Sequence, residues 1–141
     1  MMILTSINWV AVLVASVASM VLGFVWFGPL FGKQWALLAG YTEAEIEEGK
    51  KKGGMGATYF MNFVSALITM AALQFLFQKL GVESASLAIK YAFGLWLGFF
   101  ATAKYGGIML WGKNKSWTLF WIESGYQLVQ LVVAALIFVS L

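Results

Sequence analysis

The last helical hairpin decides how this chain folds; residues 94–141 read GLWLGFFATAKYGGIMLWGKNKSWTLFWIESGYQLVQLVVAALIFVSL. Two apolar runs are joined here by a short polar turn, residues 112–116. Each run contains one charged residue, Lys104 in the first and Glu123 in the second. Residues equally far from the turn of an antiparallel helix pair lie at the same height. At 1.5 Å of rise per residue, the sequence predicts that Lys104 and Glu123 meet roughly 10 Å beyond the turn.

The composition indicates an integral membrane protein. Hydrophobic residues make up 62% of the chain and charged residues only 11%, whereas a soluble domain carries about 25% charged residues. A soluble all-α domain would need far more surface charge. Each apolar run is long enough to cross a bilayer as a helix. We predict a single all-α domain, residues 1–141, built as a bundle of four transmembrane helices with a short amphipathic connector after the first. The expected helices are roughly 3–31, 57–77, 88–111 and 117–140.

The residue types that are absent exclude several kinds of chemistry. The chain has no Cys and no His, and all its charged residues are Lys and Glu. Disulfides, thiolate or imidazole metal ligands and Ser-His-Asp triads are therefore excluded. The net charge of +3 comes from loop lysines and suits contact with anionic lipid. We expect a protein that is not an enzyme, holds no metal or cofactor, binds no nucleic acid and contacts membrane lipids.

Small residues recur at helical spacing in two of the apolar runs. In the first run they are Ala11, Ala15, Ser19 and Gly23, and in the third they are Gly94 and Gly98. Such spacing lets another helix backbone approach closely. The sequence therefore predicts helix packing at these positions. Because four helices can barely enclose a solute path, the small-residue faces also suggest a homo-oligomer.

The long connection after the first run contains a helix start signal. Thr42 followed by Glu45 matches a capping box, which predicts a short surface helix from Glu43 to about Lys51. A gate or docking element and a plain solvated connector both fit this segment. Pro29 is expected to end or kink the first helix near Gly28.

Lysine counts predict the topology. The 33–56 loop and the 112–116 turn together hold most of the loop lysines, and the other side of the membrane holds only Lys79 and Lys90. By the positive-inside rule, both lysine-rich loops are cytoplasmic and both chain ends lie outside.

The polar residues inside the apolar runs form a candidate intramembrane site. Glu123, Gln127 and Gln130 share one helical face because they are spaced i, i+4 and i+7. The complete candidate site is Lys104, Glu123, Gln127, Gln130, Tyr126 and Asn62.

Two functions fit this site. A channel or transporter for a small ion or polar solute would use Glu123 as a titratable carboxylate. Alternatively, a non-enzymatic structural or accessory subunit would use the Lys104–Glu123 pair only to fix helix packing, with indole and hydroxyl donors holding the carboxylate.

One segment resembles a known family signature. Trp26-Phe27-Gly28-Pro29-Leu30-Phe31-Gly32-Lys33-Gln34-Trp35 resembles the W-[YF]-G-P-L-F-G-K-x-W motif of a bacterial four-helix membrane family of unknown function, the domain-of-unknown-function family numbered seventeen sixty-one. Ser124-Gly125-Tyr126-Gln127-Leu128-Val129 resembles its last-helix G-Y-x-L-V pattern. The resemblance implies a multi-pass protein of the bacterial inner (plasma) membrane. It brings no activity, cofactor or catalytic residue, and Glu123 stands where an asparagine is expected in that family.

Overall fold

The structure is a computed structural model that describes residues 7–52 and 56–141. Within these ranges, four helical segments are long and apolar enough to cross a membrane: Trp9–Leu30, Gly56–Leu80, Ala85–Leu110 and Trp117–Ser140. The predicted all-α polytopic membrane fold is therefore confirmed. Residues 3–6 of the first expected helix lie outside the described ranges.

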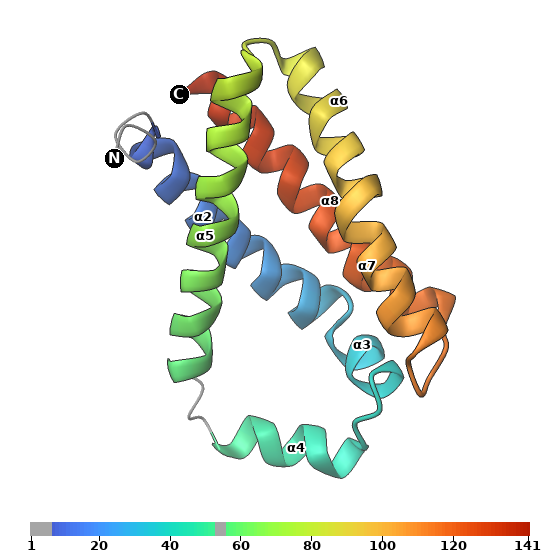
Figure 1. Ribbon diagram of the computed structural model, residues 1–141. Helices are drawn as coiled ribbons and strands as arrows, with labels where there is room; N and C mark the ends of the chain where they lie inside the picture. The colour runs from blue at the N-terminus through green and yellow to red at the C-terminus, as the bar shows by residue number, and fades with distance from the viewer. Residues whose placement is uncertain (1–6, 53–55) are drawn as a thin grey trace.

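Two of the four membrane spans, Trp9–Leu30 and Ala85–Leu110, are built from more than one helical element (Figure 1). In chain order the elements are α2 (Trp9–Val25), η1 (Trp26–Leu30), α3 (Gly32–Leu38), α4 (Glu43–Lys52), α5 (Gly56–Leu80), α6 (Ala85–Leu95), η2 (Trp96–Ala101), α7 (Thr102–Tyr105), η3 (Gly106–Leu110) and α8 (Trp117–Ser140). The three η elements are wider, π-helical turns that the sequence pattern did not predict.

Side-chain caps set the start of three spans. The Asn8 carboxamide oxygen accepts a hydrogen bond from the backbone N–H of Ala11 at 3.2 Å, so helix α2 begins at Trp9. Ser84 and Ser116 cap α6 and α8 in the same way. These caps satisfy backbone donors that the first turn of a helix leaves free.

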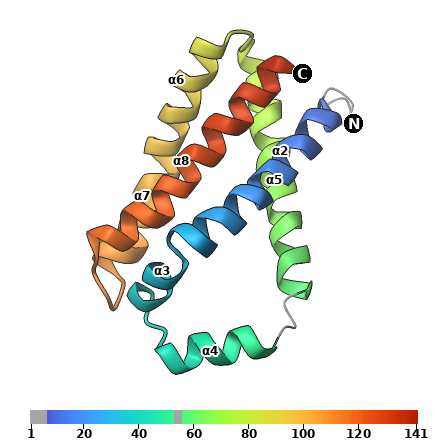
Figure 2. The same ribbon diagram turned by 180° about the vertical axis from the view of Figure 1, so that it is seen from behind.

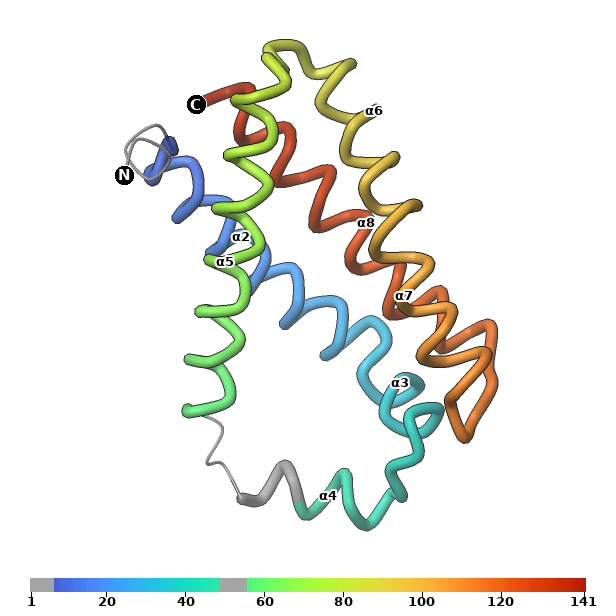
Figure 3. The backbone as a smooth tube through the Cα atoms, viewed as in Figure 1, coloured from blue at the N-terminus to red at the C-terminus, as the bar shows by residue number. Residues whose placement is uncertain are grey.

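The predicted capping box is present at the start of α4. Thr42 Oγ1 accepts from the backbone N–H of Glu45 at 3.1 Å, and Glu45 Oε1 accepts from the backbone N–H of Thr42 at 3.2 Å. Figure 3 shows α4 lying across one end of the molecule, between the end of the first span and the start of α5.

Helices α2 and α8 form the centre of the bundle. Helix α5 packs on α2, α6 packs on α8, and α2 and α8 pack on each other. Both ribbon views show this arrangement (Figures 1 and 2). The start of α2, the end of α8 and the α5–α6 turn lie at one end of the bundle, while α4 and the 112–116 turn lie at the other. The two lysine-rich connections therefore share one end, and the side of the membrane that this end faces stays a prediction.

The small residues of α2 lie where its neighbours pack. Ala11, Ala15 and Ser19 are 0%, 1% and 3% exposed. Gly23 faces Tyr126 of α8, whose hydroxyl oxygen would lie 3.3 Å from an added Cβ. The first small-residue face therefore brings α2 against its neighbours, as its spacing predicted.

The second small-residue face lies elsewhere. Gly94 and Gly98 are exposed, and apart from the adjoining residues and backbone of their own helix no described atom lies within 4 Å of an added Cβ at either position. The close contact predicted for them is therefore not made within this chain. Ala88, Ala92 and Trp96 are buried instead. These three residues recur every fourth position and share one side of the helix. Each glycine follows one of them by two residues, a rotation of about 200°, and therefore lies on the opposite side.

Two spans end in the same kind of wide turn. The backbone N–H of Phe31 donates to the carbonyl of Trp26 at 2.9 Å, and that of Trp111 donates to the carbonyl of Gly106 at 3.0 Å. Both bonds reach back five residues, as in a π-helix. Pro29 lies inside the first turn and has no N–H to donate. The regular α-helix thus ends at Val25, before the predicted position at Gly28.

A glycine follows each of these turns because no side chain fits there. A Cβ on Gly32 would lie 2.5 Å from the carbonyl oxygen of Phe27. A Cβ on Gly112 would lie 2.5 Å from the carbonyl oxygen of Ile108. The first and third spans therefore both end in a π-helical turn followed by a glycine, at the same end of the bundle.

A buried glutamine ties α5 to the start of α2. Gln74 is 5% exposed, and its Oε1 accepts from the backbone N–H of Asn8 at 3.0 Å. We expect Gln74→Met to lower the free energy of unfolding by about 1–2 kcal/mol, because the Asn8 N–H loses its acceptor. Unfolding in detergent micelles measures this change. Gln78→Met, at an exposed position of the same helix, is the control, and equal effects of the two substitutions would contradict the prediction.

Candidate functional site

Lys104 and Glu123 meet as the sequence predicted. The Lys104 Nζ lies 3.4 Å from Glu123 Oε2, and the side chains are 37% and 21% exposed. Glu123 Oε1 accepts a hydrogen bond from the indole Nε1 of Trp35 at 3.0 Å. Both oxygens of the carboxylate are therefore engaged. The pair and the indole together connect α7, α8 and α3.

Two further indoles reach the same part of α8. Trp26 Nε1 donates to the carbonyl of Ile122 at 2.8 Å, and Trp96 Nε1 donates to the carbonyl of Ser124 at 2.7 Å. With Trp35, three indoles bond to three consecutive residues, 122–124. We name this arrangement the indole clamp. An indole N–H can only donate, so a buried one needs an acceptor. The clamp therefore fixes the height and rotation of α8 against η1, α3 and η2.

The sequence predicted part of this site. The height of the charged pair and an indole donor for Glu123 were both expected, but the identity of the donor was not. The position of Trp96 in the sequence could have predicted a hydrogen bond from its indole. It lies well inside an apolar run, away from the interface where tryptophans gather, and its N–H had to find a partner there.

The other candidate residues do not all join the pair. Tyr126 donates its hydroxyl hydrogen to the carbonyl of Ser19 at 3.0 Å. Gln127 lies one turn beyond Glu123, and its Oε1 is buried without a hydrogen-bond partner in the described part of the chain. Gln130 is partly buried further along the same helix.

Asn62 lies away from the charged pair. It lines a cavity of about 370 Å³ that includes Tyr126 and excludes Lys104 and Glu123. The candidate residues therefore do not form one contiguous site: Lys104 and Glu123 pair, Tyr126 and Asn62 line this cavity, and Gln127 and Gln130 belong to neither group. Asn62 lies apart from the pair because α5 packs mainly on α2, with few contacts to α8 (Figure 1). The complete lining is Ser19, Met20, Gly23, Phe24, Phe27, Gly28, Tyr59, Asn62 and Tyr126.

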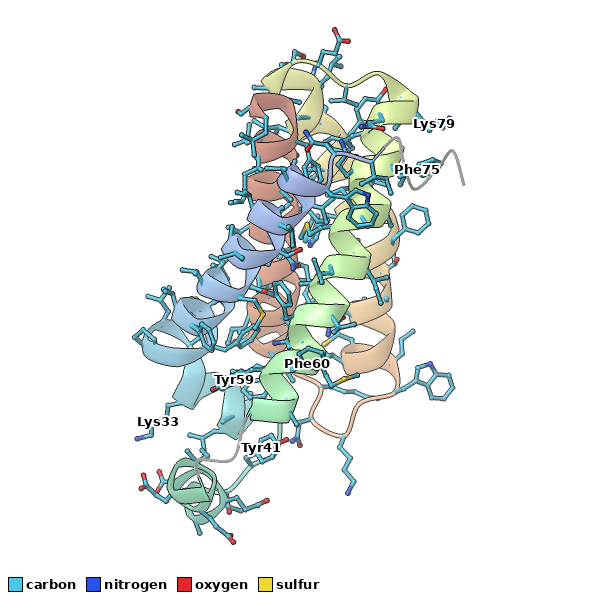
Figure 4. All side chains as sticks on the ribbon, turned by 90° about the vertical axis from the view of Figure 1, so that its left-hand side faces the viewer. Lys33, Tyr41, Tyr59, Phe60, Phe75 and Lys79 are labelled. Carbon is cyan, nitrogen blue, oxygen red and sulfur yellow. The ribbon has the colours of Figure 1, made fainter. Side chains whose placement is uncertain are left out.

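The residues of the family-like motif have different roles. Trp26 and Trp35 belong to the indole clamp, and Gly32 allows the wide turn. Lys33 is exposed and points away from the bundle (Figure 4). Gly28 borders the cavity, and apart from the adjoining residues and backbone of its own helix no described atom lies within 4 Å of an added Cβ there.

The fold and this site define a polytopic helical membrane protein in which an ion pair and three indoles hold the last span in place. The chain belongs to the family described as "Protein of unknown function (DUF1761)", whose model matches residues 10–139. No curated protein and no solved structure matches the chain.

Proposed function

We propose that this protein is a non-enzymatic structural or accessory membrane subunit, in which the Lys104–Glu123 pair fixes helix packing. One observation carries the proposal: both carboxylate oxygens of Glu123 are engaged, one by Lys104 and one by Trp35. A cation or proton carrier needs a carboxylate that can exchange its partner during transport. Glu123 is instead the centre of a contact among three helical elements.

A channel or transporter for a small ion or polar solute is the second candidate. It is favoured by the buried Gln127 Oε1, which has no partner among the described residues. A buried polar atom of this kind is often satisfied by water or a ligand. Gln130 continues the same helical face. Because four helices enclose little space, this candidate requires a homo-oligomer with the face of α8 turned toward a shared path.

Exposed apolar side chains and the distribution of lysines support contact with lipid and a particular membrane topology. Large apolar side chains are exposed on every span, as expected where helices contact membrane lipids. The lysine bias favours a cytoplasmic position for the 33–56 and 112–116 loops, with both chain ends outside.

Ion flux through liposomes separates the two candidates. We expect liposomes that contain the wild-type protein to pass protons and K⁺ no faster than protein-free liposomes, and Glu123→Gln to leave the rates unchanged. A pH-sensitive dye and a K⁺ gradient measure both fluxes. Glu83→Gln, at the exposed α5–α6 turn, is the matched control. Flux above the protein-free level that Glu123→Gln abolishes and Glu83→Gln preserves would overturn the structural proposal in favour of transport.

A further inference from the structure

We propose that the cavity between α2, α5 and α8 binds an uncharged, membrane-soluble molecule whose head group is a planar ring with carbonyl oxygens, as in a quinone. This inference does not depend on the proposed role of Glu123, because neither Glu123 nor Lys104 lines the cavity. The cavity volume of about 370 Å³ falls in the range of small-molecule sites.

Asn62 provides the first argument. Its side chain lines the cavity and forms no hydrogen bond with any residue that the structure describes. It lies six positions after Gly56, the first residue of α5, which places it about 9 Å along that span. A polar group without a partner is costly inside a bilayer. Asn62 is exposed among the described residues, so a molecule in the cavity can supply a partner for this amide.

The free hydrogen-bonding groups favour a ligand with acceptor oxygens. The hydroxyl hydrogens of Tyr126 and Ser19 are already used, since they donate to the carbonyls of Ser19 and Ala15. The Asn62 amide and the Tyr59 hydroxyl remain as donors without a partner in the described chain. Figure 4 shows Tyr59 in the first turns of α5, at the end of the bundle near α4. Two such donors suit carbonyl oxygens on a bound molecule.

The walls of the cavity favour a flat, neutral molecule. Phe24 meets Tyr59 edge to face with ring centroids 5.2 Å apart, and Phe27 meets Tyr126 in the same way at 5.2 Å. Aromatic walls of this kind pack well against a ring. The lining contains no charged side chain, so an ionic ligand would find no counter-charge. Phe24 and Tyr59 are 52% and 43% exposed. The ligand can therefore enter from the lipid between α2 and α5.

Binding of decylubiquinone to the purified full-length protein in nanodiscs tests the proposal. We expect saturable binding by the wild type and binding about tenfold weaker by Asn62→Leu, because one hydrogen bond to the ligand is lost. Ser65→Leu is the matched control, since Ser65 is exposed on the same helix and does not line the cavity. Dioctanoylglycerol, which carries carbonyls without a ring, is the comparison ligand. We expect it to bind more weakly than the quinone.

The thermal stability of each variant is measured in parallel. Asn62→Leu should unfold at the same temperature as the wild type or higher, because the amide has no partner within the described chain to lose. Absence of saturable quinone binding would overturn the proposal. Equal quinone affinity in Asn62→Leu and wild type, or tighter binding of dioctanoylglycerol, would also overturn it. The flux assays report on Glu123 alone, so failure of either proposal can be distinguished from failure of the other.

Discussion

Gly32→Ala and Gly112→Ala are each expected to lower the free energy of unfolding by about 2–3 kcal/mol. In each case the new Cβ would lie 2.5 Å from a backbone carbonyl oxygen, of Phe27 or Ile108. A carbonyl in a helical turn cannot rotate away as a flexible side chain would, so the turn itself must open. The change is measured by reversible unfolding in mixed detergent micelles.

Gly94→Ala and Gly98→Ala are the matched controls. Both glycines lie in helical segments with open space around an added Cβ. Alanine is the better helix former, so each control should be neutral or should stabilise the protein by up to about 1 kcal/mol. The prediction fails if the controls destabilise the protein as much as Gly32→Ala does. That result would instead place the Gly94–Gly98 face in a contact with a second copy.

The second large effect concerns the charged pair. We expect Lys104→Met and Glu123→Gln each to cost about 2 kcal/mol, between the small value of exposed ion pairs and the 3–5 kcal/mol of fully buried ones. The intermediate value follows from side-chain exposures of 37% and 21%. Either single change leaves one partner in an apolar surrounding without its counter-charge.

A double-mutant cycle tests this coupling directly. The double variant should be more stable than the sum of the two single costs predicts, by about 1 kcal/mol or more, because it leaves no unpaired charge. Lys79→Met is the control for loss of a lysine. Lys79 is exposed at the opposite end of the bundle, and its Nζ lies 5.7 Å from the Phe75 ring centroid (Figure 4). Its loss should cost no more than about 0.5 kcal/mol. Strict additivity of Lys104→Met and Glu123→Gln would show that the pair does not stabilise the fold.

Local sequence determined the spans and the meeting of the charged pair. Run length and hydropathy identified the four spans, since each must cover the apolar thickness of a bilayer. The short 112–116 turn forces the third and fourth spans to be antiparallel, and that alone places Lys104 and Glu123 at one height. The capping box at Thr42 was equally predictable because its bonds join residues only three apart.

Only the tertiary structure decided which residues face one another. Trp35 reaches Glu123 across 88 positions of sequence, and Asn62 lies at a cavity away from the pair. The Gly94–Gly98 face turned out to be exposed within the chain. In a soluble protein, the apolar face of a helix shows which side is buried. In a membrane, lipid and protein interior are equally apolar, so hydropathy fixes where a helix lies but not which face its neighbours cover.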